Sequence, residues 1–279
     1  MLPRSRHDLD RRLDAAAPRF AEHAFVHTVT REGLLLRLEP MTLHPRHVLD
    51  LGSATGAATE QLRKRFPKAR VHALDRSRSM LEQHRGSWLR KPSRIQADVR
   101  QLPIADNSID VVFANLLLPF VDDIGPVFTE VARVLTDGGV FAFASLGPDS
   151  FAELRRAWAA VDSAPHVAEF NDMHDIGDLL VRAGLRDPVL DIDRLGVSYE
   201  RPAALFADLT ATGARNSLAG RRQGLTGRRH WAKFTGNLFR DSKPLELDLE
   251  LVYGHAFGGA PMQARGPIAI DPVSIGRRR

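Results

Sequence analysis

The nine residues Val48–Gly56 constrain the fold of this chain more than any other stretch. An apolar run ends at Asp50, and Gly52 and Gly56 follow where a backbone has to turn sharply and let a ligand approach closely. This order predicts a buried parallel strand, a tight turn and a helix over 57–66, whose N-terminal amides face whatever binds at the turn. The alternative is an ordinary strand-to-helix turn with incidental glycines.

A second apolar strand is expected over 70–74 and ends in Asp75. A carboxylate about twenty residues beyond such a glycine turn is placed to bind the two hydroxyls of a ribose. The dinucleotide fingerprint is G-x-G-x-x-G, which seats a pyrophosphate on the helix end. Here the order is Asp50, Gly52, Ala54, Gly56. The spacing therefore favours a nucleoside site that does not hold a dinucleotide.

The composition excludes several classes of chemistry. None of the 279 residues is cysteine, which excludes disulfides, cysteine zinc sites, iron–sulfur clusters and the radical chemistry that depends on such a cluster. The 11 histidines show no helical ligand pair, so we expect no metal. We find no run near the roughly twenty apolar residues of a membrane helix and no signal-peptide segment, so we expect a cytoplasmic protein without a membrane span. The net charge of +5 suggests an acidic partner.

Two helices are expected before the first strand, over 8–17 and 19–38, with a break at Pro18. In the second helix, Phe20, Ala24 and His27 begin a loose apolar face. Helices in this position either close over the ligand of the first strand or simply pack on the domain. The sequence leaves both possibilities open.

The rest of the chain alternates between strand and helix patterns. Strands are expected over 93–97, 109–114, 140–144, 188–197 and 245–256, and helices over 77–88 with Ser77 as N-cap, 122–135, 150–161, 175–183 and 203–212. The apolar run over 109–114 suits a parallel strand buried on both faces, and it delivers Asn115 to the carboxyl edge, where open α/β sheets bind ligands. The alternation predicts a doubly wound sheet.

Two motifs carry a resemblance to a known class of enzymes. The order Asp50 to Gly56 resembles motif I of the Rossmann-like S-adenosylmethionine (SAM) methyltransferases, D-x-G-x-G-x-G, with Ala54 replacing the middle glycine. The stretch from Leu102 to Asn115 is similar to the LPFxDxSFDxVxxN region of class I methyltransferases. The resemblance implies an α/β fold with a seven-stranded doubly wound sheet whose last strand is antiparallel. A single domain over 1–279 is expected, with a helical cap (1–45), a SAM-binding core (46–146) and a substrate-side half (147–279) that contains a helical, arginine-rich insertion (202–244).

The same resemblance implies SAM as cofactor and a set of residues that bind it. In the methyltransferase pattern, Asp98 reads the adenine amino group and the backbone amide of Val99 reads a ring nitrogen; alternatively, Asp98 is a surface-loop aspartate. The implied cofactor-binding residues are Asp50, Gly52, Ser53, Ala54, Gly56, Asp75, Arg76, Asp98, Val99 and Asn115.

The second half of the chain narrows the resemblance. The stretches 157–162, 170–178, 213–216 and 225–228 look like the malonyl-acyl-carrier-protein O-methyltransferase family of biotin synthesis. This likeness implies methyl transfer from SAM to the free carboxylate of a malonyl thioester on acyl carrier protein. A related branch of assembly factors for respiratory complex I shares the fold, so the alternative is a SAM-binding assembly factor or protein-modifying enzyme.

The catalytic residues are not evident from the sequence. A carboxylate is already nucleophilic at neutral pH, so the implied reaction needs positioning and exclusion of water rather than a strong base. An arginine suits the role of carboxylate clamp, but the sequence does not single one out. Phe20 stands where the family commonly carries a tyrosine in an Ala-x-x-Tyr context, which makes it a candidate substrate-pocket residue.

The arginine-rich stretch suggests how a carrier protein is bound. Four candidates for docking an acidic acyl carrier protein by electrostatic steering are Arg221, Arg222, Arg228 and Arg229. The alternative is a solvated basic loop. Because no aromatic stacking run accompanies these basic residues, we expect no nucleic acid partner.

Overall fold

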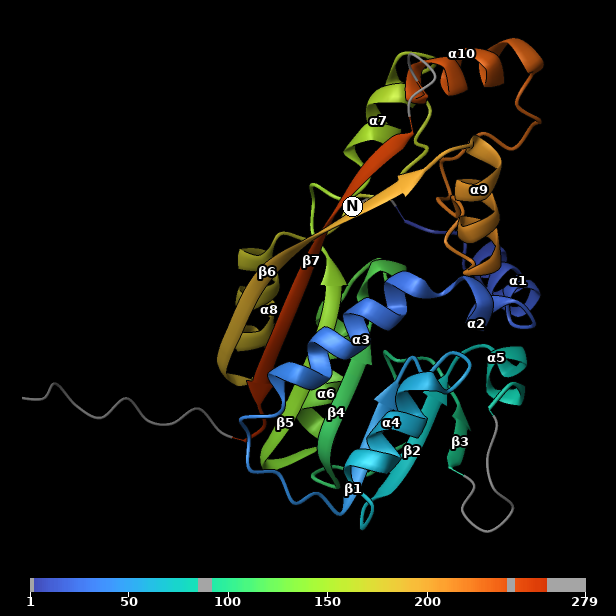
Figure 1. Cartoon of the computed structure of the whole chain (residues 1–279). Coiled ribbons are helices and arrows are strands. Elements are labelled where there is room, and N and C mark those ends of the chain that lie inside the picture. The colour runs from blue at the N-terminus through green and yellow to red at the C-terminus, as the bar shows by residue number, and fades with distance from the viewer. Residues whose placement is uncertain (1–2, 85–91, 240–243, 260–279) are drawn as a thin grey trace, which may run out of the picture.

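A seven-stranded sheet in the order β3-β2-β1-β4-β5-β7-β6 forms the centre of the molecule (Figure 1). The computed structural model describes residues 3–84, 92–239 and 244–259. The strands are β1 (His47–Leu51), β2 (Arg70–Asp75), β3 (Ser93–Gln96), β4 (Ile109–Asn115), β5 (Leu135–Leu146), β6 (Arg186–Tyr199) and β7 (Leu245–Phe257). Strands β1 to β5 are parallel, and β7 runs antiparallel to both β5 and β6. The predicted seven-stranded, doubly wound sheet with an antiparallel last strand is confirmed.

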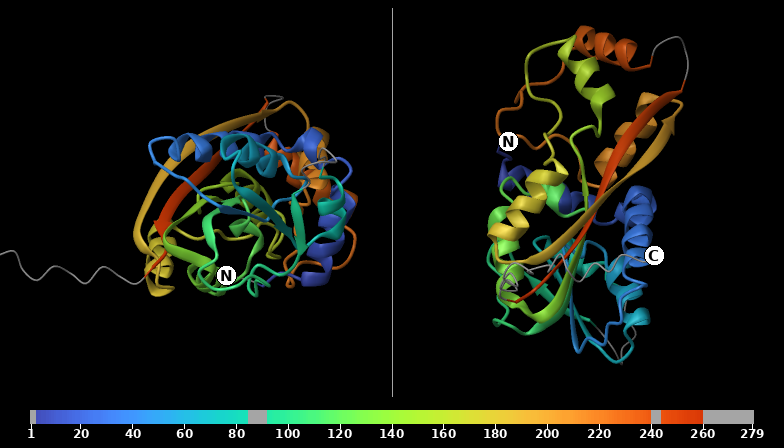
Figure 2. Two further views of the ribbon diagram at one scale, coloured as in Figure 1. Left: turned by 90° about the horizontal axis from the view of Figure 1, so that it is seen from below. Right: turned by 90° about the vertical axis from the view of Figure 1, so that its left-hand side faces the viewer.

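Helices cover both faces of this sheet. They are α1 (Arg6–Ala16), α2 (Phe20–His23), α3 (Phe25–Arg37), α4 (Ala57–Arg65), α5 (Arg78–Glu82), α6 (Gly125–Val134), α7 (Ala152–Ala159), α8 (Met173–Arg182), α9 (Pro202–Ala211) and α10 (Arg228–Leu238), with a 3₁₀ turn η1 (Leu118–Phe120). In β4, Val111 shares a core cluster with Leu62 of α4, whereas Val112 shares another with Phe128 of α6. Successive side chains of a strand point to opposite faces, so each face buries its own apolar layer. Figure 2 shows the helices and the sheet from two further directions.

The second expected N-terminal helix is in fact two helices, which corrects the sequence-based prediction. The chain leaves the helical region at Ala24, with φ −86° and ψ 40°, between α2 and α3. The break places Phe20 and Ala24 in a small cluster with Ala16, Ala17 and Met80 of α5. The N-terminal segment therefore packs on two places, with α1 and α2 beside α5 and α3 against the sheet (Figure 1).

Several elements have ends that differ from the sequence-based prediction. The helix expected from residue 122 begins at Gly125, and the strand expected over 140–144 runs from Leu135 to Leu146. Helix α5 ends at Glu82, and the part of that prediction over 85–88 lies outside the described residues. The Ser77 cap is confirmed, because the backbone N–H of Met80 donates to Oγ of Ser77 at 3.1 Å. Within the described residues, we find no helix long and apolar enough to span a bilayer.

A helical extension made of α7, α9 and α10 lies beyond the C-terminal end of β6 and the N-terminal end of β7 (Figure 1). Helix α10 is not predicted from the sequence, because the preceding stretch is noted there only for its basic residues. Its Phe234 stacks on Trp158 of α7, with ring centroids 4.0 Å apart, and Trp158 stacks in turn on His166 at 3.7 Å. This aromatic packing holds the extension together above the carboxyl edge of the sheet.

Candidate functional site

The turn after β1 has three residues in the left-handed backbone region. They are Gly52 (φ 75°), Ala54 (φ 45°) and Gly56 (φ 89°). A Cβ atom on Gly52 would lie 2.9 Å from Cδ1 of Leu117, and one on Gly56 would lie 2.7 Å from Nδ1 of His84. Both glycines are therefore required by conformation and by space. An L-residue in this region costs about 1 to 2 kcal/mol, and Ala54 carries that strain.

His84, which follows α5, closes the turn from the side. Its Nε2 atom lies 2.8 Å from the carbonyl oxygen of Ala54 and 3.4 Å from Oγ of the buried Ser53. Burial lowers the pKa of His84, so at neutral pH a neutral ring donates its Nε2 proton to Ala54. No local sequence pattern points to His84, since it lies about thirty residues beyond the turn that it supports.

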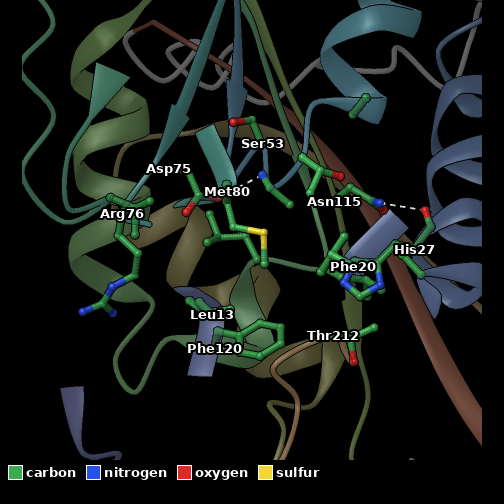
Figure 3. Close-up of a pocket in the computed structure, with 18 of the residues that line it drawn as sticks. Leu13, Phe20, His27, Ser53, Asp75, Arg76, Met80, Asn115, Phe120 and Thr212 are labelled. Carbon is green, nitrogen blue, oxygen red and sulfur yellow. Dashed lines mark hydrogen bonds between the residues drawn. The ribbon is translucent and has the colours of Figure 1, made fainter. Parts of the chain in front are cut away.

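Asp75 anchors the turn to the second strand. The backbone N–H of Ala54 donates to its Oδ2 at 2.9 Å (Figure 3). The backbone N–H of Ser77 donates to its Oδ1 at 2.8 Å. The side chain is buried, and this burial raises the pKa of Asp75. Each carboxylate oxygen keeps a further acceptor position. Asp75 is therefore able to hold the turn and to accept hydrogen bonds from a diol in the cavity.

Asp50, at the end of β1, is buried with one oxygen unsatisfied. The hydroxyl of Thr59 donates to Oδ2 at 2.5 Å, whereas Oδ1 is out of contact with solvent and has no hydrogen-bond partner among the described residues. Burial raises the pKa of Asp50 to about 7. A buried acceptor of this kind is stabilised by a bound donor or cation.

Asp98 lines the same cavity but is held by a neighbour. Nε and Nη2 of Arg100 donate to its two carboxylate oxygens at 2.9 and 2.5 Å, and Arg100 lowers the pKa of Asp98 to about 2. Val99 is buried beside it. Arg76 also lines the cavity, and its Nε lies 2.6 Å from Oδ1 of Asp10 on α1. A group that binds Asp98 therefore shares this carboxylate with Arg100.

Asn115 connects the sheet to the N-terminal helices. Its Nδ2 donates to the carbonyl oxygen of His27 on α3 at 2.9 Å, and its Oδ1 is buried without a partner among the described residues. The ring of Phe20 packs edge-on against the ring of His27, with centroids 4.9 Å apart. Figure 3 shows Leu13, Phe20 and His27 of these helices facing Ser53 and Asp75 across the cavity. The sequence left open whether the N-terminal helices cover the ligand site or only pack on the domain. The structure shows that they lie over the site.

These residues enclose a cavity of about 190 Å³ at the carboxyl ends of β1, β2 and β4. Every cofactor-binding candidate lines it except Gly56, which turns the chain into α4. A second cavity of about 350 Å³ lies between the N-terminal helices and the helical extension. The residues that line both cavities are Arg4, His27, Leu116, Phe120 and Thr212.

The larger cavity is mainly apolar, with charge at one end. Trp158, Val167 and Phe206 are among its apolar lining residues. Phe20, the candidate substrate-pocket residue, lines the smaller cavity instead. His27 lines both cavities, although its sequence pattern indicates only a place on the apolar face of its helix. Its Nδ1 is buried without a partner in the described part of the chain, and burial lowers the pKa of His27 to about 4.

The four docking candidates divide into two groups. Arg222, Arg228 and Arg229 are exposed, and the last two begin α10. Arg221 is only 15% exposed in its side chain and forms an ion pair with Asp8 of α1. This pair lowers the pKa of Asp8. Arg221 is therefore largely enclosed by the protein, and the exposed members of the docking set are Arg222, Arg228 and Arg229.

Known proteins with similar sequences identify the family to which this chain is related. Residues 49–143 match the family model described as "Methyltransferase domain". Two relatives are called malonyl-[acyl-carrier protein] O-methyltransferase. The protein from Halorhodospira halophila is 39% identical over 294 residues, which cover 100% of both chains. The protein from Gallionella capsiferriformans is 43% identical over 253 residues, which cover 87% of each chain.

Solved structures support the fold alone, because their sequences are distant. The YcgJ protein from Bacillus subtilis has a TM-score of 0.60 and 14% identity, and the match covers 81% of this chain and 98% of that one. A SAM-dependent methyltransferase from Thermotoga maritima has a TM-score of 0.52 and 16% identity, with 91% and 99% covered. Both matches indicate a similar overall fold.

Proposed function

Because this chain belongs to the malonyl-[acyl-carrier protein] O-methyltransferase family, we propose that it transfers a methyl group from SAM to the free carboxylate of a malonyl group on acyl carrier protein. The observation that carries the proposal is the pair of cavities. A cavity that carries the carboxylates of Asp50, Asp75 and Asp98, as a nucleoside site requires, shares lining residues with a larger cavity that has room for an acyl arm.

The residues of the smaller cavity fit SAM. We assign the ribose diol to Asp75 and the adenine to Asp98 and Val99, with Arg76 beside them. The amino-acid end of SAM passes along the turn after β1, which is shaped by Gly52, Ser53, Ala54 and Gly56. The unsatisfied Oδ1 atoms of Asp50 and Asn115 are both acceptors without protein donors in the described part of the chain, as expected where a ligand supplies the donor or a positive charge.

The proposed reaction needs little from the protein beyond positioning. When bound, SAM supplies an electrophilic methyl group on a sulfonium, which a carboxylate oxygen takes to give a methyl ester and S-adenosylhomocysteine. No proton is transferred, so no general base is required. The shared wall has to hold the acceptor carboxylate in line and keep water away. His27, neutral at pH 7, is able to donate one hydrogen bond there without adding charge.

SAM affinity should rise with pH through the range in which Asp50 titrates. The pKa of Asp50 is about 7 in the free protein, and a bound cation favours the ionised form and lowers this pKa. Between the lowered value and about 7, binding releases a proton, so affinity rises with pH and levels off above pH 7. Calorimetric titration across this range should show the slope in the wild type and a flatter profile in Asp50→Asn. A wild-type affinity independent of pH, or the same slope in both proteins, would contradict the assignment.

We propose that the three exposed arginines steer an acidic carrier protein to the larger cavity. Arg222 lines that cavity, and Arg228 and Arg229 lie at the start of α10 in the extension above it. Charges at the rim of an interface act mainly on the association rate and are screened over a Debye length of about 8 Å at physiological salt.

Replacing Arg222, Arg228 and Arg229 together by glutamine should raise KM for malonyl-carrier protein several-fold. Methylation of a short malonyl thioester should be unaffected, and the defect should shrink as salt is added. Arg182→Gln, on the exposed face of α8, is the matched control for loss of a surface charge. Equal losses of activity on both substrates would show that these arginines act in the site. Unchanged activity on both would show that they belong to a solvated loop without a role in docking.

The alternative function, a SAM-binding assembly factor or protein-modifying enzyme, is not favoured by the named relatives. Growth of a biotin-requiring strain that lacks its own carboxyl methyltransferase tests the choice in cells. Rescue by this chain supports the proposed reaction, and failure with well-expressed protein favours the alternative. In the proposed arrangement, residues 1–45 cap the site, 46–146 hold the cofactor and 147–279 form the substrate side. The cytoplasmic location expected from the sequence stays a prediction.

A further inference from the structure

We propose that Arg12, Arg215 and Arg221 form a binding site for the phosphodiester of the arm that carries the acceptor. The three side chains line the larger cavity, lie near enough for their charges to interact, and are called the arginine cluster below. The proposal rests on the proposed function, because a phosphopantetheine arm is what an acyl carrier protein presents. It goes beyond the proposed function by naming the three residues that bind the arm and the group, its phosphate, that they bind.

The fold brings these arginines together from distant parts of the chain. Arg12 is on α1, and the other two lie in the segment between α9 and α10. Backbone hydrogen bonds join the two regions: Ser5 N–H donates to the carbonyl oxygen of Ser217, and Ala219 N–H donates to that of Pro3, both at 2.8 Å. The cluster is therefore built by tertiary structure.

The cluster holds more positive charge than the described residues around it neutralise. Asp8 is already bound by Arg221 and by Arg11, whose Nη2 lies 3.1 Å from its Oδ1. Arg12 forms no ion pair with any carboxylate in the described ranges. The Nε atoms of Arg12 and Arg221 are also buried without a hydrogen-bond partner there. Unpaired buried donors of this kind cost free energy that an oxyanion in the cavity recovers.

The lowered pKa of Arg12 agrees with this excess of positive charge. Burial lowers the pKa of Arg12, and the charge of Arg221 lowers it further, with a smaller effect from Arg215. The guanidinium remains protonated at neutral pH, since its ordinary pKa is above 12. Guanidinium groups bind phosphate oxygens through paired, charge-assisted hydrogen bonds.

The position of the cluster favours a phosphate over the reacting carboxylate. None of its three residues lines the smaller cavity, where the methyl donor is expected. The carboxylate has to reach the shared wall, which Arg4 also lines with its Nη1 paired to Asp122 at 3.0 Å. Arg215 is exposed, so the cluster lies where the larger cavity opens to solvent. The apolar lining between cluster and shared wall is suited to the uncharged part of the arm.

Binding of the unacylated arm tests the site without any turnover. Calorimetric titration of 4′-phosphopantetheine and of pantetheine should show that the wild type binds the phosphorylated form about 10- to 100-fold more tightly. Arg12→Gln should remove most of this preference and leave the affinity for pantetheine unchanged. Arg12→Lys should keep part of it, because charge remains but the paired geometry is lost. SAM affinity and thermal midpoint report whether each variant is folded, and Arg182→Gln controls for net charge.

Two results would overturn the phosphate site. One is equal affinity of the wild type for the two compounds; the other is a loss in Arg12→Gln that is the same for both. Methylation of malonyl-pantetheine, which has no phosphate, separates this inference from the proposed function. If the wild type methylates it but shows no phosphate preference, the phosphate site alone is wrong. If the preference is present but no malonyl thioester is methylated, the proposed function is wrong.

Discussion

Replacing Asp75 by alanine should weaken SAM binding by about 100-fold or more, because the carboxylate has two tasks. It accepts backbone hydrogen bonds from Ala54 in the turn and from Ser77 at the start of α5, so its loss leaves a half-buried and a buried donor unsatisfied. It is also the group assigned to both ribose hydroxyls. Calorimetric titration measures the loss, and the circular dichroism spectrum of the variant should remain that of a folded α/β protein.

Asp98→Ala is the matched control for this prediction. Asp98 lies two residues beyond β3 and lines the same cavity, but Arg100 already satisfies its carboxylate, and the side chain is 38% exposed. Its loss should weaken SAM binding by only about 3- to 10-fold, the effect of one partly solvated hydrogen bond. Equal effects of the two substitutions, or an Asp75→Ala protein with unchanged affinity, would contradict the roles assigned to these carboxylates.

The second large effect is expected from Gly56→Ala at the start of α4. The new methyl group would be held at φ 89° and would lie 2.7 Å from the His84 ring, which bonds to Ala54. The backbone term alone costs about 1 to 2 kcal/mol. Displacement of His84 should deform the turn as well. We expect a lower free energy of unfolding in denaturant titration and SAM affinity reduced by about 10-fold or more.

Ala54→Gly is the reverse test in the same turn. Ala54 has φ 45°, so glycine relieves strain, but it also raises the entropy of the unfolded chain. A gain of up to about 1 kcal/mol in the free energy of unfolding is expected. If Gly56→Ala proved harmless while Ala54→Gly destabilised the protein, the conformation of this turn would have been misassigned.

The local part of the site could be predicted from the sequence. The turn after β1 is specified by residues only a few positions apart, so the sequence predicts the roles of Gly52 and Gly56. Asp75 follows from the next apolar run, which it ends. The sheet followed because each buried parallel strand is a short apolar run that does not depend on distant residues for its pattern. The same holds for the Ser77 cap, which needs one side chain and the first turn of α5.

The missed features all depend on long-range pairing. Arg221 belongs to a basic stretch in the sequence, yet its charge is compensated by Asp8, which is 213 residues away. His27 looks like part of an apolar helix face, and its place between two cavities arises only when β4 and the helical extension meet it. The break at Ala24 was missed because the residues on either side favour a helix, while packing against Met80 requires a turn.

Methylation of malonyl-carrier protein by the purified chain is the most direct test of the proposed function. The predicted result, seen by mass spectrometry, is a carrier heavier by one methylene group, with one S-adenosylhomocysteine formed per ester. An acetyl-carrier, which lacks the free carboxylate, should remain unmodified, and Asp75→Ala should give little product at a SAM concentration that saturates the wild type. The contradicting result is a folded protein that binds SAM and leaves the malonyl-carrier unchanged.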